Sequence, residues 1–334
     1  MNHQGDPVIE ARDLYVLIRG RRGSVIRAVD GVNVTLRRGE VVGIVGESGS
    51  GKTVLALTLL RLEPANSDVQ GAIYFRGEDL VQKTQREMRS IRGSELSMIF
   101  QDPMTSLNPV FTVGNQLREA IRLHDPEHRH EATARGVAAL QAVRIPSPAE
   151  RLSQYPHEIS GGMRQRVVSA LAMVGEPAVL IADEPTTALD VTTQSQYLTM
   201  LRSVQARSGA ALLFISHDLA LVRRVVDRVI VMYAGQIVEE GAVETLFESP
   251  AHPYTRALID CAATDSVFAP VSPIEGQPPD MADPGVACRF APRCRFASDI
   301  CAEQEPALDE RAFSHMARCW GTSEGGWIKD GWHD

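Results

Sequence analysis

The most chemically specific stretch of the chain places three glycines, a lysine and a threonine at the spacing of a loop that binds phosphate. The stretch consists of Gly46, Glu47, Ser48, Gly49, Ser50, Gly51, Lys52 and Thr53. Glycine suits such a loop because several backbone N–H groups must turn inward toward phosphate oxygens, and side chains would block that turn. The Lys52 ammonium would reach the outer phosphates, and the Thr53 hydroxyl would bind Mg²⁺.

The flanking residues predict that this loop connects a strand to a helix. The apolar run 41–45 predicts a buried strand, and the apolar residues 54–57 predict the opening of a helix. This context supports phosphate binding because a helix N-terminus carries partial positive charge. It disfavours the alternative of a glycine-rich turn that contains a lysine by chance.

A pair of acids follows a second apolar run. Residues 179–182 predict a buried strand, and Asp183 and Glu184 come directly after it. Asp183 can hold Mg²⁺, directly or through water, and Glu184 can orient or deprotonate an attacking water. An acidic turn without function is the alternative, which the phosphate loop upstream disfavours.

Composition limits the kind of protein this can be. The 334 residues suggest one large domain with an extension, or two domains. The net charge of -8, from 34 basic and 42 acidic residues, argues against a nucleic-acid partner, although it leaves open a local basic patch. The longest apolar runs, such as 212–215, are too short to cross a bilayer, and the first six residues lack an apolar signal region. We therefore expect a cytosolic protein that reaches a membrane only through a partner.

The order of predicted elements indicates an α/β fold. Short apolar strands alternate with turn signals up to about residue 100, helical spacing follows over 113–123 and 132–143, and strand–helix alternation resumes at 179. Such alternation implies a parallel sheet covered by helices, here with a helical insertion in its middle. From about Ser249 the composition shifts toward proline and cysteine.

Four of the five cysteines gather in the last 50 residues, at Cys288, Cys294, Cys301 and Cys319. In a cytosolic chain such a cluster more often holds a metal than a disulfide. Four thiolates can bind Zn²⁺ or an iron–sulfur cluster, and the spacing alone does not choose between them. Cys261 stands apart, and we expect it to be a buried apolar thiol.

Further motifs resemble those of ATP-binding cassette (ABC) ATPases. Residues 159–165, which include Ser160, Gly161 and Gly162, resemble the signature motif of that family. Residues 99–103 resemble its Q-loop through Gln101, residues 187–190 resemble its D-loop, and residues 215–218 carry the switch histidine, His217. The motifs occur in the family's order and with family-like separations over residues 8–250.

This resemblance implies a fold and a division into domains. Residues 1–250 would form an α/β nucleotide-binding domain, with a RecA-like parallel-sheet core, an antiparallel β subdomain and a helical subdomain at about 103–178. Residues 251–334 would form a small cysteine-rich extension. We expect the phosphate loop to belong to a core separate from this extension, so that nucleotide binding survives changes in the extension.

The resemblance also implies ATP and Mg²⁺ as ligands. Glu184, His217 and Gln101 would be catalytic, and Thr53, Gln101 and Asp183 would hold Mg²⁺. Ser160, Gly161 and Gly162 would contact the γ-phosphate of ATP bound to a second ATPase subunit. The residue that stacks on adenine is unassigned, because relatives often carry an aromatic near the position of Ile18, and Tyr15 is out of strand phase with it.

Two segments narrow the resemblance to the oligopeptide/dipeptide/nickel importer branch, and within it to the D-type ATPase subunit of dipeptide importers. They are residues 98–109 and residues 252–258, which read His-Pro-Tyr-Thr-Arg-Ala-Leu. Met163 departs from the glutamine usual in the wider family but is usual in this branch.

D-type subunits carry a [4Fe–4S] cluster on this cysteine pattern, so the resemblance favours that cluster over Zn²⁺ at Cys288, Cys294, Cys301 and Cys319.

The implied function is ATP-powered import of dipeptides or oligopeptides. The chain would lie at the cytoplasmic face of the inner membrane with a second homologous ATPase and two transmembrane permease subunits, and would act indirectly with an extracytoplasmic substrate-binding protein. Import of nickel or another small solute is the alternative. A soluble ABC ATPase of translation or repair is disfavoured by the single cassette. A module without catalysis is disfavoured by the intact residues Lys52, Gln101, Asp183, Glu184 and His217.

Overall fold

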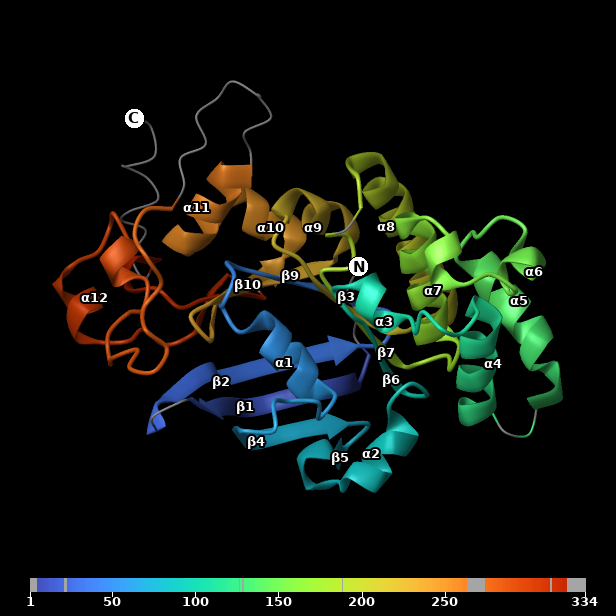
Figure 1. Ribbon diagram of the computed structural model, residues 1–334. Helices are drawn as coiled ribbons and strands as arrows, with labels where there is room; N and C mark the ends of the chain where they lie inside the picture. Colours follow the sequence, from blue (N-terminus) through green and yellow to red (C-terminus); the bar gives the residue numbers. More distant parts are fainter. Residues whose placement is uncertain are drawn as a thin grey trace. The chain divides into compact units, whose positions relative to one another are not determined.

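A computed structural model describes residues 5–20, 23–125, 127, 129–187, 189–262, 274–312 and 314–322 (Figure 1). The chain divides into two compact units, each built from several segments. Unit 1 comprises Met1–Glu10, Thr35–Val41 and Tyr74–Ile215, and unit 2 comprises Ala11–Val34, Val42–Ile73 and Ser216–Asp334. Residues after 250 therefore belong to the same compact unit as the phosphate loop.

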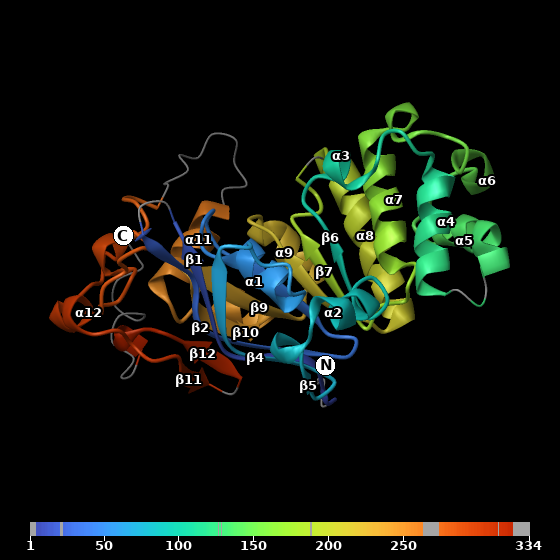
Figure 2. The ribbon, with the colours of Figure 1, turned by 60° about the horizontal axis from the view of Figure 1, so that its bottom comes forward.

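Unit 1 contains three parallel strands with helices packed on them. Strands β6 (Leu96–Ile99), β7 (Val179–Asp183) and β8 (Ala211–Ile215) pair in register, with Val179 opposite both Leu96 and Ala211. Every residue of the three strands is buried, as expected for parallel strands covered on both faces. Figure 2 shows helices α7 (Gly161–Met173) and α8 (Val191–Ser208) beside these strands.

Between β6 and β7 the chain forms a group of helices. These are α3 (Pro103–Ser106), α4 (Val113–His124), α5 (Ala132–Ala142), α6 (Pro148–Arg151) and α7. Threonine or serine caps α4 and α7: the Thr112 hydroxyl accepts the Asn115 N–H, and the Ser160 hydroxyl accepts the Met163 N–H. Figure 2 shows α4, α5 and α6 on the side of α7 that faces away from the strands.

Unit 1 also holds two short elements that follow strand β4 (Ser67–Phe75). Strand β5 (Glu78–Asp79) pairs with Tyr74 and Phe75, and α2 (Gln85–Ile91) begins with a capping box. In that box the Thr84 hydroxyl accepts the Glu87 N–H, and the Glu87 carboxylate accepts the Thr84 N–H. These bonds define the start of α2.

Unit 2 is built on a sheet to which the C-terminal region adds strands. Strand β3 (Val41–Val45) pairs in parallel with β9 (Arg228–Tyr233), and β9 pairs antiparallel with β10 (Gln236–Ala242). Strand β12 (His315–Ala317) then pairs with β10, and β11 (Asp309–Ala312) pairs with β12. The cysteine-rich extension is thus continuous with this sheet.

Helices and a second sheet complete unit 2. Strands β2 (Val25–Arg37), β1 (Pro7–Arg19) and β4 (Ser67–Phe75) are neighbours in that order, and α1 (Lys52–Leu59) follows the phosphate loop. The remaining helices are α9 (Leu219–Val225), α10 (Val243–Glu248), α11 (Pro253–Ala262) and α12 (Asp299–Glu303). Figure 1 shows α9, α10 and α11 along β9 and β10. None of the helices in the described ranges is long and apolar enough to cross a bilayer.

A buried carboxylate ties the extension to β10. Glu239 is fully buried and accepts the backbone N–H groups of Ala251 and His252, at 2.7 and 2.8 Å. Its Oε1 atom also lies 2.8 Å from Nε2 of His315 on β12. Because a buried carboxylate is stable only when it is paired, Glu239 holds the entry to α11 and the added strand β12 in place.

We predict that Glu239→Ala lowers the free energy of unfolding by about 3 kcal/mol or more, because it leaves buried donors without an acceptor. Glu240→Ala is the matched control on the next residue of β10, where the carboxylate is partly exposed and pairs with Arg228. We expect this control to cost about 1 kcal/mol or less. Urea unfolding of both variants measures the difference, and equal losses would contradict the role assigned to Glu239.

Candidate functional site

The phosphate loop of unit 2 is packed so tightly that two of its glycines admit no side chain. A Cβ atom on Gly51, whose φ is +100°, would lie 2.2 Å from the carbonyl oxygen of Ala28. A Cβ atom on Gly46 would lie 2.1 Å from the carbonyl oxygen of Met232. These backbone contacts with β2 and β9 hold both ends of the loop, which explains why glycine is required there.

Lys52 folds back over the loop that precedes it. Its side chain is buried, and the ammonium donates to the carbonyl oxygens of Gly46 and Glu47, both at 2.8 Å. It also lies 3.3 Å from the Ser50 hydroxyl. Thr53 follows in the first turn of α1 and is exposed. The ammonium and the start of α1 therefore lie on one short loop, the arrangement that phosphate binding requires.

Unit 1 brings Gln101 and Glu184 together. Asp183 is buried at the end of β7, and Glu184 follows with a φ of +45°, a backbone conformation that is unfavourable for residues other than glycine. The Gln101 amide donates to Oε2 of Glu184 at 3.0 Å, and the Thr187 hydroxyl donates to the same oxygen at 3.1 Å. Two candidate catalytic residues that are 83 positions apart thus share one hydrogen bond.

The signature residues lie at the start of α7 in unit 1. Ser160 and Gly161 are exposed, and the Ser160 hydroxyl caps the helix at the Met163 N–H, 3.3 Å away. Gly162 packs on α8, where an added Cβ would lie 2.9 Å from the Thr193 methyl group. The small residues therefore leave an exposed helix start, and such a start attracts an anionic group.

His217 lies in the turn between β8 and α9 and is exposed. The neighbouring residues define that turn: the Ser216 hydroxyl accepts the Asp218 N–H, and the Asp218 carboxylate caps α9 at Ala220 and Leu221. His217 belongs to unit 2 with the phosphate loop, whereas Asp183, Glu184 and Gln101 belong to unit 1. In the D-loop, Ala188 lies outside the described residues, and Asp190 caps α8 at Thr193.

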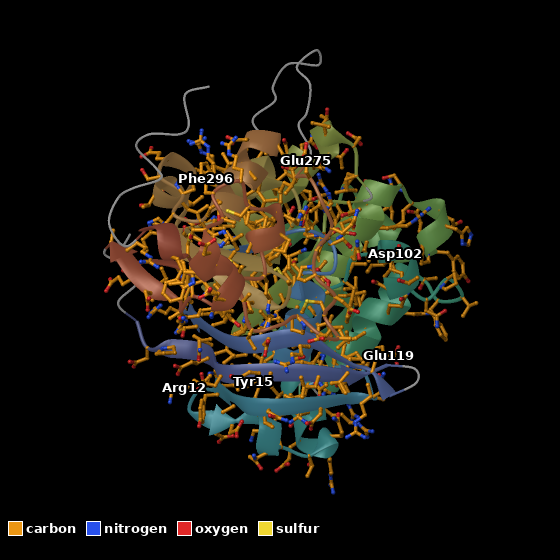
Figure 3. The ribbon with its side chains drawn as sticks, turned by 90° about the vertical axis from the view of Figure 1, so that its left-hand side faces the viewer. Arg12, Tyr15, Asp102, Glu119, Glu275 and Phe296 are labelled. Atoms are coloured by element: carbon orange, nitrogen blue, oxygen red, sulfur yellow. The ribbon has the colours of Figure 1, made fainter. Side chains whose placement is uncertain are left out.

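Tyr15 and Ile18 lie on opposite faces of β1, as the strand phase indicates. Leu14 and Val16 are buried, whereas Tyr15 is exposed beside them, and Figure 3 shows it on the strand near Arg12. The Tyr15 ring contacts Gly31, where an added Cβ would lie 3.3 Å from its hydroxyl. Tyr15 thus has a packing role on β1, and the adenine contact stays unassigned.

The extension contacts the phosphate loop directly, and sequence reasoning missed this contact. The two terminal guanidinium nitrogens of Arg293, Nη1 and Nη2, donate to the Glu47 carboxylate at 2.6 and 2.9 Å. The Tyr254 hydroxyl accepts the Glu47 N–H at 2.8 Å. The expectation of a phosphate loop separate from the extension is therefore wrong. In the sequence, only the position of Arg293 beside the second cysteine could have indicated this contact.

The four C-terminal cysteines line one cavity within unit 2. Its other walls are largely apolar and aromatic, and they include Phe290, Phe296 and Trp320. All five cysteines of the chain are free thiols, and Cys261 does not line this cavity. The lining cysteines are Cys288, Cys294, Cys301 and Cys319.

Burial shifts the pKa of three of these thiols. It raises the pKa of Cys288 and of Cys294 above the ordinary value, and it raises the pKa of Cys319 to about 12. Among the described residues, no group of three or more His, Cys, Asp or Glu side chains is arranged to hold a metal ion. The cavity thus brings the four cysteines together in one place.

Known proteins are similar to this sequence over nearly all of its length. A probable peptide ABC transporter ATP-binding protein of Sinorhizobium fredii is 47% identical over 327 residues, covering 97% of both chains. The family model described as ABC transporter matches residues 29–187. The chain belongs to the ABC transporter family of ATP-binding proteins.

Within the ABC family, a second model, described as the C-terminal region of oligopeptide/dipeptide transporters, matches residues 238–301. The dipeptide transport ATP-binding protein DppD of Bacillus subtilis is 44% identical and covers 94% of this chain and 95% of its own. The solved structure of cbiO1 from Clostridium perfringens, part of the ABC transporter complex cbiONQ, is 28% identical, covers 73% of this chain and 92% of its own, and has a TM-score of 0.62. These findings confirm the ABC ATPase fold and its oligopeptide-branch resemblance.

We predict that Gly51→Ala lowers the free energy of unfolding by about 2 kcal/mol or more, because its methyl group would collide with the backbone of β2. Gly23→Ala is the matched control. Gly23 also has a positive φ, of +83°, but nothing lies within 4 Å of an added Cβ. We expect the control to cost about 1 kcal/mol from backbone strain alone. Chemical denaturation compares the two, and a smaller loss for Gly51→Ala would contradict the packing described for the loop.

Proposed function

We propose that this chain is the ATP-binding and ATP-hydrolysing subunit of an importer of dipeptides or oligopeptides. The observation that carries the ATPase assignment is the pairing of Gln101 with Glu184 directly after the buried Asp183, in a chain with a complete phosphate loop. The cargo assignment rests on the match to the oligopeptide/dipeptide transporter C-terminal region and on relatives named as peptide or dipeptide transporters. The same relatives favour peptides over the nickel alternative.

In this proposal the residues of the phosphate loop bind ATP. The Lys52 ammonium exchanges its carbonyl partners for the outer phosphate oxygens, and the backbone N–H groups of residues 48–53 surround the phosphates. The hydroxyl of Thr53, the amide oxygen of Gln101 and the carboxylate of Asp183 would hold Mg²⁺, and oxygen donors of these kinds are the ligands that Mg²⁺ prefers. When bound, Mg²⁺ neutralises charge that develops on the phosphates.

Glu184 acts on the attacking water. Its carboxylate orients the water and accepts a proton as the water oxygen bonds to the γ-phosphorus, while the bond to the ADP oxygen breaks. The hydrogen bonds from Gln101 and Thr187 restrict the orientation of the carboxylate. His217 contacts the γ-phosphate and responds to its release.

The exposed start of α7 serves a second nucleotide. Ser160, Gly161 and Gly162 complete the ATP site of a second, homologous ATPase subunit, and that subunit's signature completes the site on this chain. Two transmembrane permease subunits and an extracytoplasmic substrate-binding protein complete the importer. The chain then works at the cytoplasmic face of the inner membrane, held there by the permease subunits.

We infer from the resemblance to D-type subunits that the cysteine cavity takes a [4Fe–4S] cluster rather than Zn²⁺. Tetrahedral Zn²⁺ with bonds of about 2.3 Å would bring its four sulfurs within about 3.8 Å of one another. In a [4Fe–4S] cluster each cysteine binds its own iron, which spreads the four sulfurs around a larger group. The four free thiols line one largely apolar cavity, which gathers this set of ligands in one place, and the choice of the cluster rests on the resemblance to D-type subunits. Bound there, the cluster cross-links an extension that has little core of its own.

We predict that Glu184→Gln reduces ATP turnover in the assembled importer by about 100-fold or more, because it removes the group that accepts the proton. ATP affinity should be retained, since Glu184 acts on water rather than on nucleotide. Lys52→Ala is the comparison, and it should weaken ATP binding itself by removing a charge from the phosphates. Nucleotide titration and steady-state hydrolysis separate the two effects. Turnover of Glu184→Gln near that of the unmodified chain would refute its role.

We predict that protein purified without oxygen contains about four iron atoms per chain and absorbs broadly near roughly 400 nm. Replacing Cys288, Cys294, Cys301 or Cys319 by serine should remove the iron and the colour. Cys261→Ser is the control, because Cys261 does not line the cavity, and it should keep both. Metal analysis that finds one zinc and no iron would exclude the cluster.

A further inference from the structure

The loop between Cys288 and Cys294 places an arginine against the phosphate loop with every donor in use. The Arg293 side chain is only 3% exposed. Its Nε donates to the Glu275 carbonyl at 2.9 Å, and one terminal nitrogen donates to the Ile274 carbonyl at 3.1 Å and to Glu47. The other donates to Glu47 and to the Tyr233 hydroxyl, 3.2 Å away. All five guanidinium N–H groups are thus paired, which holds the side chain in one orientation.

Glu47 is held from two directions at the first variable position of the phosphate loop. Its carboxylate pairs with Arg293, and its backbone N–H donates to the hydroxyl of the fully buried Tyr254. This N–H therefore points toward the extension rather than toward a phosphate. The two contacts fix the outer side of the loop, while the inner side stays available to nucleotide.

Aromatic packing joins these two contacts into one structure. The centroids of the Tyr233 and Tyr254 rings lie 4.6 Å apart. Phe290 belongs to the same cysteine loop as Arg293, and its ring centroid lies 5.3 Å from each of these two centroids. The Arg293 guanidinium lies over the Tyr233 ring at 5.7 Å. Movement of the cysteine loop would therefore displace Arg293 and loosen the packing around Tyr254.

A second arginine of the cysteine loop attaches it to the core of unit 2. The buried Arg289 pairs with the Asp30 carboxylate on β2 and donates to the carbonyl of Ala234. Ala234 lies in the turn between β9 and β10, and the Asp30 N–H donates to the Gly235 carbonyl of the same turn, at 2.9 Å. Gly235 in turn donates to Ser50 of the phosphate loop, at 3.0 Å. The cysteine loop thus reaches the phosphate loop by two routes.

We propose that Arg293 is a positioning residue for nucleotide binding: acting through Glu47, it holds the phosphate loop in its binding conformation, and the folded cysteine loop places Arg293. This rests on the proposed binding of ATP at residues 46–53. The physical basis is pre-organisation, because a loop already held in its bound shape loses less freedom when ATP binds. Coupling of this kind is reciprocal, so ATP must also stabilise the cysteine loop.

A double-mutant cycle on the full chain tests the coupling, with a fluorescent ATP analogue as the probe. Arg293→Ala should raise the Kd of the analogue about 5-fold or more, a change within the usual range of coupling between sites. Glu47→Ala should raise it similarly, and the double variant should lose no more than either single variant. Arg293→Lys should recover part of the affinity. Arg256→Ala, which breaks an exposed ion pair with Asp260, is the control and should leave the Kd unchanged.

If Arg293→Ala does not fold, Glu47→Gln tests the same contact, because it removes the ion pair and keeps the side-chain size. Losses that simply add in the double variant would overturn the proposal. An unchanged Kd for both single variants would overturn it too. Lys52→Ala separates this failure from failure of the proposed function: if Lys52→Ala also leaves the Kd unchanged, ATP does not bind at this loop at all.

The role of the cysteine loop is tested by hydrogen exchange and by Cys294→Ser. With the ATP analogue bound, amide exchange over residues 288–294 should slow relative to the free chain, and Arg293→Ala should abolish that protection. Cys294→Ser should raise the Kd about as much as Arg293→Ala, whereas Cys261→Ser should not change it. Exchange that is the same with and without the analogue would refute the link between the two loops.

Discussion

A loop that must turn its backbone N–H groups toward a ligand cannot use them to hold its own shape. The phosphate loop is therefore held by its surroundings. The carbonyl oxygens of Ala28 and Met232 press on its glycines, and the Gly235 N–H donates to its Ser50 carbonyl. The Lys52 ammonium donates to two of its carbonyl oxygens. Much of unit 2 follows from this requirement, since β2, β9 and the turn after β9 all supply backbone to the loop.

The candidate catalytic residues of unit 1 are positioned in a different way. Strands β6, β7 and β8 are buried on both faces, and among their residues a charged side chain appears only at a strand end. Asp183 takes the last position of β7, and Glu184 takes the first position beyond it, in a backbone conformation that costs energy. The hydrogen bonds from Gln101 and Thr187 hold that carboxylate in place. Strain and hydrogen bonding together restrict Glu184 to one arrangement.

Local patterns predicted the local elements well. The apolar runs became β3, β7 and β8, and helical spacing over 113–123 and 132–143 became α4 and α5. Strands β11 and β12 were not predicted, because they are short and β10, the strand on which β12 pairs, lies about 80 residues earlier in the chain. The contact of Arg293 with Glu47 spans 246 positions and leaves no periodicity in the sequence. The motif at 252–258 indicated a family but not that Tyr254 holds the phosphate loop.

The strands that the extension adds to unit 2 also decide how its sheet ends. Without them, β10 would be the last strand, with a row of backbone groups available to pair with another chain. With them, the last strand is β11, only four residues long, and it carries Asp309, Glu310 and Arg311. Short, charged edge strands resist pairing between molecules. The C-terminal region therefore protects the protein against edge-to-edge aggregation, and a chain that ended before residue 309 would lose this protection along with the His315 partner of Glu239.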